Sequence, residues 1–155
     1  PIVSLTATDL NRDGGDDLIL TMQVSGKVNT QVLFNNKKGY FYAKDNLGPY
    51  QLRRGINKVV AEDIDQDGDK DIVIGNVGQQ NVIYFNEAKG TKYRSLSFGV
   101  ATSATYCVAL GDLNGDKYPD IVIGNSGTHN FVYLNQGKKG KVGNLSPPQQ
   151  LALKQ

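Results

Sequence analysis

The chain has 155 residues, a net charge of +2, 39% hydrophobic residues and 18 glycines. This composition excludes a disordered or collagen-like protein, and no stretch approaches the roughly 18 consecutive apolar residues of a transmembrane helix. The apolar runs are short and rich in Val and Ile, and eight Tyr but no Trp are present. These proportions favour strands joined by turns, so we expect a globular β protein.

The acidic residues are strongly clustered along the chain. Twelve of the fifteen lie in three nine-residue segments, 9–17, 63–71 and 112–120, which we call loops 1, 2 and 3. Like charges at this density repel one another, and a bound cation is the usual physical reason for such crowding.

Three similar segments follow one another, each containing one acidic loop. Each predicts a strand, the acidic loop, a strand, a Gly/Asn loop, a strand, a basic turn and a weaker fourth strand. The first aspartates of the loops, Asp9, Asp63 and Asp112, are 54 and 49 residues apart, about the length of one four-stranded propeller blade. We therefore expect an all-β fold of three four-stranded antiparallel β-propeller blades. The predicted blades span about residues 1–49, 50–99 and 100–155.

The second repeat predicts its strands most clearly, at residues 56–61, 71–75, 81–86 and 93–98. The run Ile72-Val73-Ile74 is apolar without alternation, which is typical of a strand buried on both faces between neighbouring blades. The single cysteine, Cys107, also lies in an apolar stretch, so we expect a buried, inert thiol.

Each acidic loop has the donor pattern of a calcium site. Oxygen-bearing side chains fall at loop positions 1, 3, 5 and 9, and position 7 would add a backbone carbonyl. Together they supply the six or so hard oxygen ligands that calcium prefers, whereas soft metals are disfavoured without a nearby Cys or His. The predicted ligands are Asp9, Asn11, Asp13, Gly15 and Asp17 in loop 1; Asp63, Asp65, Asp67, Asp69 and Asp71 in loop 2; and Asp112, Asn114, Asp116, Tyr118 and Asp120 in loop 3.

Three other interpretations of the acidic loops fit less well. An EF-hand is excluded, because its loop ends in Glu at position 12, where this chain has Leu20, Ile74 or Ile123. Magnesium favours sparser protein ligation, and acidic turns that bind nothing would leave their carboxylates unpaired three times over. Loop 2 carries four carboxylates among its side-chain ligands against three in the others, so we predict the tightest binding there.

Glycine also distinguishes the loops from one another. Gly14 and Gly68 at position 6 permit the positive φ that the turn needs, whereas loop 3 has Lys117 there and Gly115 at position 4. The geometry or affinity of loop 3 is therefore expected to differ.

The repeat resembles the FG-GAP and VCBS repeats of integrin α-subunit propellers, bacterial surface proteins and some fungal lectins. Besides the loops, the resemblance rests on Gly75-Asn76, Gly124-Asn125 and Phe98-Gly99. It implies a calcium-binding β-propeller in which each acidic loop joins the first two strands of a blade.

The predicted metal role is structural, because all inferred ligands come from protein and no acid, base or nucleophile accompanies them. Extracellular calcium modules bind at about 0.1–1 mM, so such sites would be mostly empty in the cytosol. We therefore expect an extracellular, cell-surface or periplasmic protein. The lysine-rich turns at 37–38, 89–92 and 138–141 should share one end of the blades with the acidic loops, which disfavours a nucleic-acid patch.

The opposite end of the blades is the candidate partner face, because binding residues concentrate on loops held by a rigid scaffold. We expect a binding or adhesion module for a protein or glycan; the alternatives are the propeller part of a carbohydrate-active enzyme, such as a polysaccharide lyase, and a structural assembly component. The lone His129, with no Ser or Cys partner, argues against an enzyme. The candidate partner residues are Tyr50, Arg53, Arg54, Gln79, Gln80 and His129.

Three blades are fewer than the four to eight of a closed propeller. Further blades are expected from the same longer chain, from a second copy in a homodimer, or from another subunit.

Overall fold

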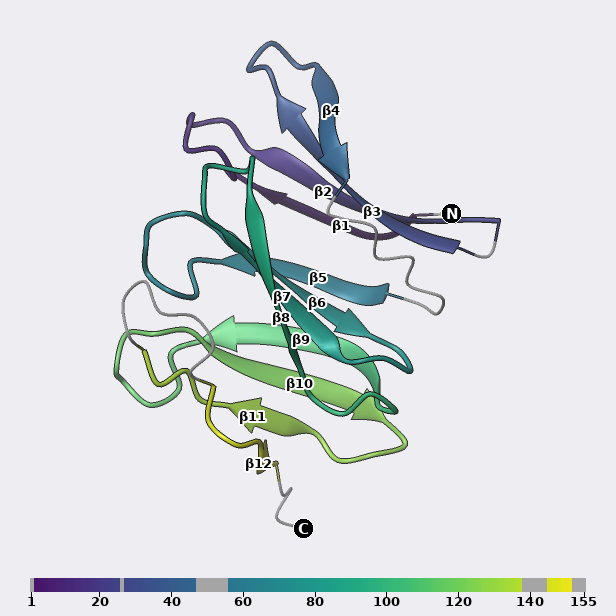
Figure 1. Ribbon diagram of the computed structural model, residues 1–155, viewed down its shortest axis with the longest axis vertical. Coiled ribbons are helices and arrows are strands. Elements are labelled where there is room, and N and C mark those ends of the chain that lie inside the picture. The colour runs from purple at the N-terminus through teal and green to yellow at the C-terminus, as the bar shows by residue number, and fades with distance from the viewer. Residues whose placement is uncertain (1, 26, 47–55, 138–144, 152–155) are drawn as a thin grey trace.

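The computed structural model describes residues 2–25, 27–46, 56–137 and 145–151. These residues form three four-stranded antiparallel sheets, which confirms the all-β, three-blade fold that the repeats predict. Within this described part, no helix has the length and apolar character needed to cross a membrane. Figure 1 shows the sheets stacked along the long axis, with the N-terminus in one outer sheet and the C-terminus in the other.

Each sheet is one blade whose strands are paired in chain order. Blade 1 contains β1 (Ile2–Thr8), β2 (Asp17–Val24), β3 (Lys27–Asn35) and β4 (Phe41–Asn46). Blade 2 contains β5 (Ile56–Glu62), β6 (Asp71–Asn76), β7 (Asn81–Asn86) and β8 (Tyr93–Phe98). Blade 3 contains β9 (Ala104–Gly111), β10 (Asp120–Ser126), β11 (Phe131–Tyr133) and β12 (Gln149–Gln150). The four strands expected in the second repeat agree with β5 to β8 within one residue.

The first strands of the blades lie side by side. β5 contacts β1 on one side and β9 on the other, so the three blades are joined along their first strands. The fourth strands form the opposite edge of each sheet. Among the described residues the blades form an open stack rather than a closed ring (Figure 1).

An apolar cluster joins blade 1 to blade 2. Ile19 and Val32 of blade 1 pack with Ile72 and Ile74 of blade 2, and each of the four is at most 2% exposed. Burial of such side chains contributes about 1.5–3 kcal/mol each, so this junction is a main source of stability.

A second apolar cluster joins blade 2 to blade 3. It contains Val73 and Ile83 of blade 2 with Ile121 and Ile123 of blade 3, all at most 1% exposed. Phe98 and Tyr133 meet edge to face across the same junction, with ring centroids 5.2 Å apart. Every residue of β6 is buried, as its unbroken apolar run predicts, because β6 has a blade on each side.

The expectation of a buried Cys107 is wrong, because its thiol is exposed. The register of β9 against β10 shifts between Gly124 and Asn125, and the inserted residue is Tyr106. Beyond this bulge Val108 turns toward blade 2, so Cys107 points to the opposite face of blade 3. An apolar stretch thus becomes exposed where no blade of the described chain covers that face.

Candidate functional site

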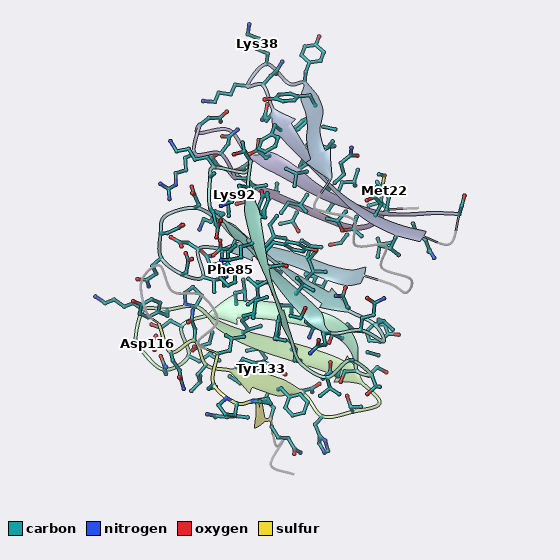
Figure 2. The ribbon with its side chains drawn as sticks, viewed as in Figure 1. Met22, Lys38, Phe85, Lys92, Asp116 and Tyr133 are labelled. Atoms are coloured by element: carbon teal, nitrogen blue, oxygen red, sulfur yellow. The ribbon has the colours of Figure 1, made fainter. Side chains whose placement is uncertain are left out.

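The acidic loops connect the first two strands of each blade and lie at one end of the molecule. Loop 1 joins β1 to β2, loop 2 joins β5 to β6, and loop 3 joins β9 to β10. Figure 2 shows Asp116 of loop 3 at this end, whereas Met22 lies toward the opposite end of β2.

The backbone of each loop adopts the left-handed conformation at two positions. Position 6 has positive φ at Gly14 (85°), Gly68 (93°) and Lys117 (73°). Position 4 does too, at Arg12 (57°), Gln66 (58°) and Gly115 (81°). Loop 3 therefore has its glycine at position 4, whereas loops 1 and 2 have theirs at position 6. The left-handed positions are the same in all three loops. Only the need at position 6 was foreseen from the sequence.

Replacing Lys117 with glycine should stabilise the protein. Lys117 holds φ at 73° with an exposed side chain, and a left-handed non-glycine residue costs about 1–2 kcal/mol. Lys117→Gly should therefore raise the free energy of unfolding by about 1 kcal/mol, measured by urea denaturation. The reverse change in loop 1, Gly14→Lys, is the matched control and should lower it by a similar amount, since no atom crowds that position. Equal stability of all three proteins would contradict the strain argument.

Side chains at positions 1, 3 and 5 fold each loop around its own amides. In loop 1, Asp9 accepts hydrogen bonds from the N–H groups of Asp13 and Gly14 at 3.1 and 2.8 Å. Asn11 accepts one from Asp13 at 2.9 Å, and Asp13 accepts one from Gly15 at 2.8 Å. Loops 2 and 3 repeat the bonds from position 6 to 1, from 5 to 3 and from 7 to 5.

The aspartate at position 9 is held more firmly than the others. Asp71 Oδ2 accepts the N–H of Ile64 at 2.8 Å, and its Oδ1 accepts the N–H of Asn86 at 2.9 Å. Asp17 and Asp120 make the equivalent pairs of bonds in blades 1 and 3. All three carboxylates are 0% exposed, and each ties its loop to an asparagine at the end of the third strand or just beyond it.

Loop 2 brings three carboxylates together. One oxygen each from Asp63, Asp65 and Asp71 lies within 4.8 Å of the other two. Asp63 Oδ1 is buried and has no hydrogen-bond partner among the described residues. A buried anionic oxygen without a partner is costly, and a cation held by hard oxygen ligands removes that cost. The donor set of loop 2 therefore fits calcium.

The electrostatics of loop 2 favour uptake of a positive charge. Burial raises the pKa of Asp71 to about 7, with repulsion from Asp65 and Asp67 adding to the effect. Burial also raises the pKa of Asp63 and of Asp65, and each is further raised by the charge of Asp67. Each shift means that the isolated negative charge is disfavoured, so either a proton or a metal ion lowers its cost.

The raised pKa of Asp71 predicts an unusual pH dependence without metal. Between pH 3.8 and about 7 the folded chain keeps the Asp71 proton that the unfolded chain has released. Because the folded state then binds more protons, Asp71 makes stability fall as pH rises through this window. The test compares urea denaturation midpoints of the wild-type chain and Asp71→Asn in the presence of chelator. The wild-type midpoint should fall relative to that of Asp71→Asn as the pH rises from 4.5 to 7.5. A constant difference between the two midpoints would contradict the raised pKa of Asp71.

The carboxylates of loops 1 and 3 lie farther apart than those of loop 2. All of their residues are described, and no three carboxylates in either loop come as close as those of loop 2. In loop 1, Lys37 Nζ lies 3.4 Å from Asp13 Oδ1. In loop 3, Asp112 is exposed, and hydrogen bonds from backbone amides, first that of Lys117, lower its pKa. Loop 2 is therefore the loop with the closest carboxylate cluster, and the tightest binding there stays a prediction.

The loops are linked to one another through position 4. Arg12 Nε lies 2.6 Å from Asp69 Oδ1, and its Nη2 donates to the carbonyl of Asp67 at 2.8 Å. Gln66 of loop 2 donates in the same way to the carbonyl of Lys117 in loop 3. The side chain of Asp69 is thus paired with blade 1, and Asp67 lies toward the exposed rim of loop 2.

Basic turns do lie beside the acidic loops, as the strand order predicts. Lys37 pairs with Asp13, and the backbone N–H of Lys89 points to Asp69 Oδ2 at 3.5 Å. Lys92 pairs with Glu87 in its own turn at 2.8 Å. The third basic turn, at 138–141, lies outside the described residues. Basic and acidic side chains therefore lie next to each other at this end in the described part of the chain.

The candidate partner face is described in part. Gln79, Gln80 and His129 lie on the turns between the second and third strands of blades 2 and 3, and Gln80 and His129 are exposed. Both turns are built alike: Asn76 donates to the carbonyl of Gln80, and Asn125 to that of His129, each at 2.7 Å. Tyr50, Arg53 and Arg54 fall in 47–55, outside the described residues.

Two residues with recurring contacts were missed from the sequence. One is the apolar residue at position 2 of each loop, represented by Leu10 and Ile64, which are 0% and 3% exposed. The other is an asparagine at or just beyond the end of the third strand, represented by Asn86 and Asn135, whose side chains donate to the loop of the preceding blade. The aligned repeats carry a signal for both. An apolar residue recurs at position 2 of every acidic loop, and an asparagine recurs after the third apolar run of every repeat.

Comparison with known families gives two matches. A family model described as an FG-GAP-like repeat matches residues 9–74 and 63–123, so each match runs from one acidic loop through the next. A model described as an FG-GAP repeat matches residues 106–142. No curated protein gives a significant match.

Proposed function

The chain belongs to the FG-GAP repeat family, and we propose that it is a calcium-stabilised β-propeller module that binds a protein or glycan outside the cytoplasm. The observation that carries the calcium part is the loop 2 cluster, where three carboxylates converge and the buried Asp63 Oδ1 has no described hydrogen-bond partner. The threefold repeat of the loop supports one site in each blade.

Calcium would be held in loop 2 by the carboxylates of Asp63, Asp65 and Asp71, completed by Asp67 and the carbonyl of Asp69. The ion would supply positive charge that offsets the burial and the mutual repulsion that raise their pKa values. Asp9, Asn11, Asp13, Gly15 and Asp17 would serve loop 1, and Asp112, Asn114, Asp116, Tyr118 and Asp120 loop 3. The chain's own contribution is the fixed position-9 carboxylate, which joins each loop to the asparagine at or just beyond the end of the third strand.

The role of the metal is to stabilise blades rather than to catalyse a reaction. Each site supplies a few tenths to a few kcal/mol, according to the ratio of calcium concentration to dissociation constant. Modules of this affinity class are filled at extracellular calcium levels, and FG-GAP repeats are typical of extracellular and secreted proteins. We therefore propose that this chain is extracellular, on the cell surface or periplasmic.

We assign ligand binding to the end opposite the calcium loops. The turns carrying Gln80 and His129 project exposed side chains from a rigid hydrogen-bonded base, which suits recognition of polar groups. The base is rigid because Asn81 and Asn130 side chains accept the N–H groups of Asn76 and Asn125 at 2.9 and 2.8 Å. A hydrogen-bonding partner such as a glycan or a polar protein surface fits these turns.

Glycan-array binding in millimolar calcium tests this assignment. Gln80→Ala and His129→Ala should each weaken binding to the glycans that the wild-type chain binds. Lys38→Ala, at the opposite end of the blades, should leave this binding unchanged. Loss of binding with Lys38→Ala alone would place the partner at the calcium end. Depolymerisation of an acidic polysaccharide by the purified chain would overturn the non-enzymatic assignment.

A further inference from the structure

Arg12 of loop 1 reaches across the junction between blades 1 and 2 and lies on loop 2. Its Nε is 2.6 Å from Asp69 Oδ1, and its Nη2 donates to the carbonyl of Asp67 at 2.8 Å. The guanidinium also covers Gly68, because a Cβ added to Gly68 would collide with it. Arg12 therefore contacts three consecutive residues of loop 2 at once.

Arg12 and a calcium ion would use different oxygens of the same two residues. In the proposed site, Asp67 supplies its carboxylate and Asp69 its backbone carbonyl. Arg12 instead contacts the carbonyl of Asp67 and the carboxylate of Asp69. Asp67 Oδ1 lies 3.9 Å from Arg12 Nη2, which is beyond hydrogen-bond distance. Arg12 therefore holds the backbone at positions 5 and 7 without a hydrogen bond to the ligand oxygens there.

The other half of the loop 2 site is held within blade 2. Asp71 accepts the N–H groups of Ile64 and Asn86, and Asp63 Oδ2 accepts that of Gly68 at 2.9 Å. Positions 5 and 7 are the ones that blade 1 contacts through Arg12. The site in loop 2 is therefore assembled from groups fixed by two different blades.

The position of Arg12 in its own loop ties it to the first site as well. Arg12 lies between Asn11 and Asp13, which are both predicted ligands of loop 1, and its φ is 57°. An ion held by these two neighbours would fix the backbone from which the Arg12 side chain extends. One residue is thus anchored in the first site and rests on the second.

Arg12 has two opposing effects on an ion in loop 2. Its positive charge repels a cation, whereas a loop that is already held loses less conformational freedom on binding. The guanidinium is paired with the carboxylate of Asp69, a residue that is 7% exposed, so the pair as a whole is neutral. The repulsion from such a pair falls off faster with distance than that from a single charge. We therefore expect the ordering of the loop to outweigh the repulsion.

We propose that Arg12 is a positioning residue for the calcium site of loop 2 and that it couples calcium binding in loops 1 and 2 positively. This inference rests on the proposed calcium function. Calcium in either loop orders one end of the Arg12 contact, so the second ion binds to a loop that is already held. Coupling between sites ranges from about 5-fold to 150-fold, and a single side chain places it near the lower end, at about 5-fold.

Gln66 makes the corresponding contact from loop 2 to loop 3, where it donates to the carbonyl of Lys117. Gln66 is neutral, so it adds a hydrogen bond but no ion pair. Coupling between loops 2 and 3 should therefore be weaker than that between loops 1 and 2. Gly115 occupies the same position in loop 3 and has no side chain to extend.

A calcium titration followed by heteronuclear NMR measures the two loops separately. The N–H groups of Gly14 and Gly68 each bond to the first aspartate of their own loop, so each signal reports its own site. Asp13→Asn removes a charged ligand from loop 1 and keeps an oxygen acceptor for the turn. It should lower the calcium affinity of loop 2 about 5-fold, as should Arg12→Ala. The double variant should lower it no further, because Arg12 is the route of the coupling.

Three further variants separate positioning from charge. Arg12→Lys keeps the positive charge without the planar fork that contacts Asp67 and Asp69 together, so it should lower loop 2 affinity as Arg12→Ala does. Lys38→Ala removes an exposed charge from the neighbouring basic turn and should leave both loops unchanged. Asp65→Asn in loop 2 should lower the affinity of loop 1, because coupling between two sites is reciprocal.

The outcomes distinguish failure of the coupling from failure of the calcium function. If both glycine signals respond to calcium and Arg12→Ala leaves loop 2 affinity unchanged or raises it, the coupling is refuted and the calcium function stands. The coupling is also refuted if the loss in the double variant is the product of the two single losses. If neither Gly14 nor Gly68 responds to millimolar calcium, the proposed function fails and the coupling with it.

Discussion

Replacing Asp71 with alanine should lower the free energy of unfolding by about 2–5 kcal/mol in the presence of chelator, even though it removes an unfavourable negative charge. The carboxylate accepts the buried N–H groups of Ile64 and Asn86, and alanine leaves both without an acceptor. Each unsatisfied buried donor costs about 1–3 kcal/mol, which outweighs the relief of repulsion from Asp65 and Asp67. Urea denaturation of both proteins measures the difference.

Asp67→Ala in the same loop is the matched control for Asp71→Ala. Asp67 is exposed, and its one hydrogen bond within the loop, to the N–H of Asp69, lies near solvent. Its loss should cost less than about 1 kcal/mol in chelator. Both variants should lose part of the stabilisation by calcium. If the two substitutions destabilise the metal-free chain equally, position 9 has no structural role beyond that of the other loop carboxylates.

Replacing Leu10 with alanine should cost about 3 kcal/mol, because it empties the junction between blades 1 and 2. Leu10 is 0% exposed, packs in the first apolar cluster and has its carbonyl bonded to Asn86. The change removes buried methyl groups and leaves a cavity beside Phe34, whose ring and the carbonyl of Leu10 both border Gly90. Denaturation in urea, followed by circular dichroism, gives the free-energy difference.

Leu151→Ala is the control for Leu10→Ala. Leu151 follows β12 at the edge of blade 3 and is 44% exposed, so its truncation should change stability by no more than about 0.5 kcal/mol. Comparable losses from the two substitutions would mean that the position-2 residue does not hold the blades together.

The fold could be predicted because its signals are repeated and local. The spacing of Asp9, Asp63 and Asp112 gives the blade length, and the unbroken apolar run of β6 indicates burial between two sheets. Strand ends in blade 2 followed from the turn residues to within one position. None of these inferences needed contacts between residues distant in the sequence.

The candidate site was foreseen in outline, whereas the contacts that join the blades were not. Donor spacing identified the loops, yet it could not show that Asp71 bridges two backbone amides or that Arg12 reaches Asp69 in the next loop. Such contacts depend on how neighbouring blades stack. The error at Cys107 has a related cause, because burial there depends on a β-bulge and on which blade covers the face.

Scanning calorimetry of the chain in calcium, magnesium and chelator tests the central claim most directly. Calcium at ten times the dissociation constant contributes about 1.4 kcal/mol per site, so three sites should raise the melting temperature by roughly 10 °C over chelator. Magnesium should raise it much less, and Asp65→Asn in loop 2 should remove more of the calcium effect than Asn11→Ala in loop 1. An unchanged melting temperature in millimolar calcium would contradict the account.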